Sequence, residues 1–110
     1  MPSRDYRRTA EDPAVVREVA AALRTRWDPD GLLLRAADGD ADFYSAHGLA
    51  LTSMVAAGGE QPEVARYLRQ VEQRLLGSSL HPFKSRYAVS VAVWRTVHGP
   101  PSARQQPNVR

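Results

Sequence analysis

The sequence predicts an all-α protein, a compact bundle of about four helices with one irregular loop between the first two. Two observations predict this fold class. Apolar residues recur at helical spacing in most segments, and proline or glycine stands at the ends of those segments. Because a chain of 110 residues suits one domain, we expect a flexible N-terminus over 1–11, a single helical domain over 12–98 and a disordered tail over 99–110.

The first helix is predicted over 13–27. Asp12 is a suitable N-cap, and Pro13 fits the first helical position, where a missing N–H costs nothing. One helical arc carries the apolar side chains Val15, Val16, Val19, Leu23 and Trp27. The helix ends at Asp28-Pro29, because a residue before proline is disfavoured in the α region.

The segment 28–40 is predicted to be an irregular loop. It begins with a tight turn to which we assign a structural role, formed by Trp27, Asp28, Pro29 and Gly31. A strand over 32–34 would have no partner, so we expect these leucines to hold the loop against the core. We therefore expect Trp27 to matter for stability and Asp30 to matter little.

The second helix is predicted over 42–57, with Asp40 or Asp42 as its cap. Gly58-Gly59 ends it, because a glycine adopts the left-handed conformation that follows many helices. Gly48 lies inside this helix, where glycine costs about 1 kcal/mol relative to alanine. We therefore expect another helix to approach closely at Gly48.

The third helix is predicted over 62–76. Pro62 and Glu63 suit its first turn, and Gly77 suits the position just past its end. At about 100° per residue, one arc of about 60° contains Val64, Leu68, Val71 and Leu75. This is the clearest amphipathic pattern in the chain.

The last element, over 82–98, has two readings. Alternating apolar residues at Tyr87, Val89, Val91 and Val93 are typical of a strand. Helical spacing instead places on one face the residues Phe83, Tyr87, Val91, Trp94 and His98. We choose the helix because about 16 residues is long for a strand. Val89 and Val93 lie off this face, so self-association through them, as a homo-oligomer, is compatible with the pattern.

Acidic residues do not form a convincing metal site. Asp38, Asp40 and Asp42 match the start of a calcium loop. However, Phe43 stands where that loop needs glycine, and Leu49 stands where it needs a bidentate glutamate. The chain contains no cysteine, which excludes disulfides and thiolate sites. We predict no metal and no cofactor.

The histidines do not form a catalytic or metal-ligand motif. His47, on the apolar side of the second helix, is predicted to be a hydrogen-bonded core or boundary residue. His81 precedes a proline, and His98 suits a last helical turn, where an imidazolium favours the helix dipole. Their spacing matches no metal motif. We therefore assign no catalytic residue.

The basic residues are candidates for a partner surface. The predicted contacts on the third helix and the start of the last are Arg66, Tyr67, Arg69, Gln73, Lys84 and Arg86. The net charge is only +3, and Glu63 and Glu72 dilute the positive field on the third helix, which disfavours nucleic acid. A basic face suits an acidic protein better.

No apolar signal segment and no stretch of about 18 apolar residues is present, so the sequence predicts a cytoplasmic protein that does not enter a membrane. The lack of cysteine fits a reducing compartment.

The order of motifs resembles the YugE-like family, which comprises small bacterial all-helical proteins of unknown function. The resemblance covers roughly residues 13–78 and rests on a W-D-P-x-G turn, an acidic-aromatic helix start and a "YL…E…LG" helix. The matching residues are Trp27, Asp28, Pro29, Gly31, Asp42, Phe43, Tyr44, Tyr67, Leu68, Glu72, Leu76 and Gly77. Asp30 departs from the pattern, and the last element has no counterpart in it. The resemblance implies a helical fold and no catalytic residues.

These observations favour a small non-enzymatic protein-binding module. Small bacterial proteins of this kind are often immunity proteins, which neutralise a cognate toxin by steric occlusion. The first alternative is a nucleic-acid-binding protein that uses an Arg-rich helical face. The second alternative is a small enzyme that uses His47 or His98.

Overall fold

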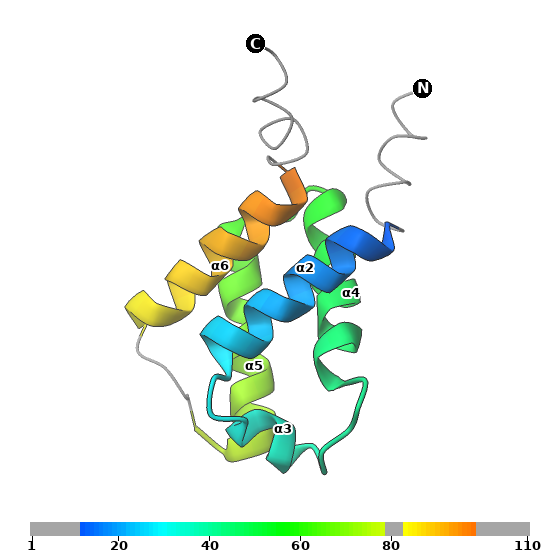
Figure 1. Ribbon diagram of the computed structural model, residues 1–110. Helices are drawn as coiled ribbons and strands as arrows, with labels where there is room; N and C mark the ends of the chain where they lie inside the picture. The colour runs from blue at the N-terminus through cyan, green and yellow to red at the C-terminus, as the bar shows by residue number, and fades with distance from the viewer. Residues whose placement is uncertain (1–11, 79–82, 99–110) are drawn as a thin grey trace.

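The computed structural model describes residues 12–78 and 83–98, and every element in this part of the chain is helical. The elements, in order, are α2 (Pro13–Ala22), the π-helical turn η1 (Leu23–Trp27), α3 (Leu32–Ala36), α4 (Phe43–Ala56), α5 (Gln61–Leu76) and α6 (Phe83–His98). Four longer helices pack around a shared core (Figure 1). The predicted all-α bundle is thus confirmed. The predictions for 1–11, His81 and 99–110 lie outside the described residues.

The first predicted helix is present as α2 followed by η1. Asp12 caps it, since its Oδ1 accepts a hydrogen bond from the Ala14 N–H at 2.9 Å. In the π-helical turn, the Asp28 N–H donates to the Leu23 carbonyl at 3.0 Å. Leu23 and Trp27 are both fully buried. The side chains at both ends of the π-helical turn therefore lie in the core.

The segment 28–40 is not an irregular loop throughout, because it contains the short helix α3. Gly31 precedes this helix with φ of 70°, a left-handed conformation that glycine adopts readily. The Asp28 carboxylate accepts from the N–H groups of Leu33 and Leu34, both at 3.0 Å. These donors would otherwise be unsatisfied at the helix start. Five residues are too few for a helical period to show in the sequence.

The second predicted helix is α4, and its C-terminal end uses the expected residues. Asp42 stands at the N-cap position as predicted but makes no capping hydrogen bond, whereas the Asp40 Oδ1 accepts from the Asp42 N–H at 2.9 Å in the turn before the helix. At the other end, the Gly59 N–H donates to the Met54 carbonyl and the Gly58 N–H to the Val55 carbonyl, which is a Schellman motif.

The close contact expected at Gly48 is confirmed, and it lies between α4 and α2. A Cβ atom at Gly48 would stand 3.2 Å from both the Ala20 nitrogen and the Val16 carbonyl oxygen. Figure 1 shows α2 crossing α4. The two backbones meet at this glycine because it has no side chain to separate them.

The third predicted helix is α5. Glu60 and Glu63 form a capping box at its start, and Gly77 ends it with φ of 76°. Val64, Leu68 and Val71 are buried as the helical arc predicts, with Leu75 partly buried against the core.

The last element is a helix, α6, but its predicted face was wrong. Val89, Val93 and Val97 are buried, whereas the Tyr87 side chain is 37% exposed. The inward side of α6 also carries Arg86 and Ser90, which makes it look polar in the sequence. Helical spacing shows which residues share a face but not which of two mixed faces turns inward. Self-association through Val89 and Val93 is excluded by their burial.

No helix within residues 12–78 and 83–98 is both long enough and apolar enough to cross a membrane.

Candidate functional site

Two adjoining hollows between α5 and α6 form one groove, which we call the α5/α6 groove. They share Pro62 and Tyr87. The residues that line the groove are Glu60, Gln61, Pro62, Ala65, Arg66, Arg69, Arg86, Tyr87 and Trp94. This set combines three of the six predicted contact residues with two aromatic residues that the sequence had placed on the core side of the last helix.

One end of the groove is aromatic. Tyr87 is held in place because its hydroxyl donates to the Gln61 Oε1 at 2.8 Å. Trp94 is half-buried, and its ring lies 4.4 Å from the His98 ring, measured between centroids. Tyrosine and tryptophan offer a large contact area at little loss of side-chain freedom. This end can therefore hold an apolar or aromatic group of a partner.

The other end of the groove is basic. Arg66 and Arg69 are exposed, and neither forms an ion pair with any residue that the structure describes. The nearby acids Glu60 and Glu63 already accept hydrogen bonds from backbone N–H groups in the α5 capping box. Both guanidinium groups are therefore available to carboxylates of a partner, which arginine binds in a two-pronged geometry.

Arg86, which lines the groove, belongs to a buried charged cluster. Arg86 is 5% exposed and Glu72 is 0% exposed. Arg86 donates to Glu72 through its Nη2 at 3.3 Å and its Nε at 3.4 Å. The Trp27 Nε1–H donates to Glu72 Oε2 at 2.7 Å. The prediction of Arg86 as a surface contact is corrected, because its charge is used inside the protein.

Glu72 was missed by sequence reasoning, which treated it as a surface acid. One signal was present in the sequence: a buried tryptophan usually finds an acceptor for its indole N–H. Trp27 and Glu72 are 45 residues apart, so nothing local shows which acceptor it uses.

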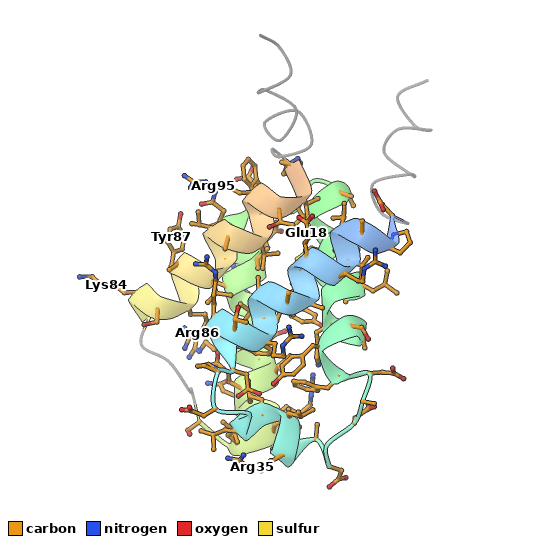
Figure 2. All side chains as sticks on the ribbon, in the orientation of Figure 1. Glu18, Arg35, Lys84, Arg86, Tyr87 and Arg95 are labelled. Carbon is orange, nitrogen blue, oxygen red and sulfur yellow. The ribbon has the colours of Figure 1, made fainter. Side chains whose placement is uncertain are left out.

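The remaining predicted contacts lie outside the groove. Gln73 and Lys84 are exposed, and Lys84 points away from the bundle at the start of α6 (Figure 2). Tyr67 instead faces α4, where its hydroxyl lies 2.6 Å from the Nδ1 of His47. Figure 2 shows Lys84 and Tyr87 on the outer side of α6. The arginines Arg66 and Arg69 are thus the predicted contacts that the structure brings together on the surface.

His47 is a hydrogen-bonded boundary residue, as the sequence predicted. Its ring packs edge-on against Phe43, with 4.8 Å between centroids, and against Tyr67 at 5.6 Å. Burial, with a smaller contribution from the Arg74 charge, lowers the pKa of His47. Burial likewise raises the pKa of Tyr67. The α5/α6 groove is lined by neither His47 nor His98.

The turn acid Asp28 is structural, as the sequence predicted. Its side chain is buried, and its Oδ2 accepts from the Tyr44 hydroxyl at 2.7 Å in addition to the α3 backbone. Burial and this hydrogen bond raise the pKa of Tyr44 to about 12. In the described part of the chain, no group of three His, Cys, Asp or Glu residues could hold a metal ion.

Comparisons of this chain with protein-family models, curated proteins and solved structures gave no match.

Proposed function

We propose that this protein is a non-enzymatic protein-binding module that binds an acidic partner in the α5/α6 groove. The observation that carries the proposal is the side-by-side placement of Arg66 and Arg69 with Tyr87 and Trp94. Arginine, tyrosine and tryptophan are the residue types enriched at the energetic centres of protein interfaces.

The two ends of the groove recognise different features of a partner. The exposed guanidinium groups attract carboxylates and speed the encounter, an effect that salt weakens. The aromatic end contributes apolar contact, which salt affects little. A partner with acidic residues beside an apolar or aromatic side chain suits both ends.

The class of partner that we propose is a bacterial toxin, which would make this protein an immunity-type protein of the cytoplasm. A preformed groove between two packed helices suits steric occlusion, because little order has to be gained on binding. The resemblance to the YugE-like family supplies no catalytic residue and is compatible with such a role.

A pair of double variants tests the binding surface. Arg66→Glu with Arg69→Glu reverses the charge of the groove, and Arg24→Glu with Arg26→Glu makes the same charge change at exposed residues of η1. The proteins captured by the wild type are identified, expressed again in pure form and titrated calorimetrically. We expect the groove variant to weaken binding at least tenfold, about 1.4 kcal/mol, and the η1 variant to bind like the wild type.

Equal loss in both variants, or no partner that binds in pure form, would contradict the proposed function. The toxin class has its own test, in which the identified partner is expressed alone and together with this protein. Growth arrest that the wild type relieves and the groove variant does not would support it, and a harmless partner would refute it.

The same variants distinguish the nucleic-acid alternative. Binding through arginine–phosphate contacts falls steeply with added salt, because counterions are released on binding. Retention of the wild type on DNA or RNA with that dependence, and its loss in the groove variant, would favour nucleic acid as the partner.

A further inference from the structure

A second surface groove lies between α2 and the first half of α4, away from the α5/α6 groove. Its apolar lining comes from Pro13, Val16, Ala46 and Leu49. The Leu49 side chain is 50% exposed, more than Leu32 at 41% or Tyr87 at 37%. The residues that line this groove include none of those that line the α5/α6 groove. We call this surface the α2/α4 groove.

Two opposite charges border the α2/α4 groove. Arg17 lies on α2, and Asp42 immediately precedes α4. Asp42 stands at the N-cap position of α4, yet its carboxylate makes no capping hydrogen bond. Neither side chain forms an ion pair with another residue in the described ranges 12–78 and 83–98. Within these ranges, both charges therefore lie without an ion-pair partner beside an apolar surface.

We propose that two copies of this chain associate through the α2/α4 groove around a twofold axis. In such a self-complementary interface, every contact occurs twice. Arg17 of each copy meets Asp42 of the partner subunit, which gives two equivalent ion pairs. Leu49 of each copy packs against the apolar lining of the other. The exposed leucine and both charges are thereby accounted for by one arrangement.

A second copy fits the α2/α4 groove better than a different partner. An acidic protein would be attracted by Arg17 but repelled by Asp42. A basic protein would be attracted by Asp42 but repelled by Arg17. An apolar ligand would bury both charges without a counter-charge, which is unfavourable. A surface with one charge of each sign around an apolar centre is complementary to itself.

The dimer does not depend on the proposed function, since the two grooves are formed by different pairs of helices. It would leave both α5/α6 grooves free, so that each dimer offers two binding surfaces.

Sedimentation equilibrium of the full chain, from low micromolar to submillimolar concentration, tests the dimer. We expect a reversible monomer–dimer equilibrium. Leu49→Glu places a charge at the centre of the interface and should raise the dissociation constant at least tenfold. Leu32→Glu makes the same change at an exposed leucine of α3, outside the groove, and should leave the dissociation constant unchanged. Circular dichroism verifies that both variants remain folded.

A charge exchange tests the predicted pairing directly. Arg17→Asp alone and Asp42→Arg alone place like charges opposite each other twice, so each variant should be monomeric. An equimolar mixture of the two single variants should associate, because every pair is again of opposite sign. The double variant Arg17→Asp with Asp42→Arg should also dimerise.

A monomeric wild type at submillimolar concentration would overturn the proposal. So would a dimer that Leu49→Glu leaves intact, or single charge variants whose mixture does not associate. A failure of the dimer proposal can be distinguished from a failure of the proposed function. The Leu49→Glu variant is titrated calorimetrically with a partner of the α5/α6 groove. Binding of that partner should persist in the monomer, because the α5/α6 groove does not need the dimer.

Discussion

Trp27 and Arg86 meet at one buried carboxylate, that of Glu72. The Trp27 indole N–H donates to Glu72, and Glu72 also accepts from Arg86, so one carboxylate joins η1, α5 and α6. A buried charge is costly unless it is paired and hydrogen-bonded, and this carboxylate has both kinds of partner. The cluster therefore favours one arrangement of the three elements over alternative packings of their apolar faces.

The first prediction concerns Trp27. Trp27→Ala leaves a cavity and removes a donor from buried Glu72, so we expect the free energy of unfolding to fall by about 3–5 kcal/mol. Asp30→Ala should change it by less than about 0.5 kcal/mol, because Asp30 is exposed and its bond to Arg35 is accepted by the main-chain carbonyl, which alanine keeps. Equilibrium urea unfolding measures both values. An unchanged midpoint in Trp27→Ala would refute this role.

The second prediction concerns pH and His47. Burial lowers the pKa of His47 in the folded protein, so the unfolded chain, with a pKa near 6.5, binds the proton first as pH falls. The contribution of His47 to stability is therefore complete above pH 6.5 and is lost as pH falls below it. Urea midpoints across this range should fall less with acid in His47→Gln than in the wild type. Equal slopes, or ring proton shifts that titrate above pH 6.5, would contradict it.

The roles of individual residues could be predicted from the sequence where they depend on residues nearby in the chain. Burial of Trp27 follows from the apolar arc, and the structural role of Asp28 follows from the turn. The pairing of Glu72 with Arg86 could not be predicted, because both residues are charged and charged residues normally lie on the surface. Their burial depends on the packing of α5 against α6, which no short sequence window contains.

Helix ends were more predictable than helix faces. Asp12 and Gly77 act as their residue types suggest, since capping depends on a few neighbouring residues, whereas the capping box that Glu60 forms with Glu63 was not predicted. The orientation of α6 depends instead on its contacts with α2, α4 and α5. Tyr87 and Trp94 were consequently assigned to the core, although they line the candidate binding groove.

The third prediction tests the orientation of α6. Val93 is fully buried and Val91 is half-buried, and threonine has nearly the shape of valine. Val93→Thr buries a hydroxyl and should cost about 1–3 kcal/mol. Val91→Thr should cost clearly less, and the similar helix propensities of the two residue types cancel in the comparison. Urea unfolding of both variants measures the difference. A larger loss at Val91 would mean that α6 presents its other face to the core.

At the scale of the whole molecule, α6 completes a core that the earlier helices leave open. It contacts α2, α4 and α5 and contributes the buried residues Val89, Val93 and Val97. It also supplies the counter-charge for Glu72.

The last prediction follows from this arrangement. A chain that ends at Ser78 lacks α6, so Glu72 loses its ion-pair partner and the surfaces of α2 and α5 that α6 covers are exposed to water. The three buried valines of α6 contribute about 1.5–3 kcal/mol each, and Glu72 also loses the charge that pairs with it. Both effects together are comparable with the whole stability of a small domain. We therefore expect no cooperative thermal transition by circular dichroism, whereas a chain that ends at His98 should unfold in a single transition. A cooperative transition in the shorter chain would show that α2 to α5 form a stable core without α6. The last helix, and the groove that it forms with α5, would then be an addition to a complete fold.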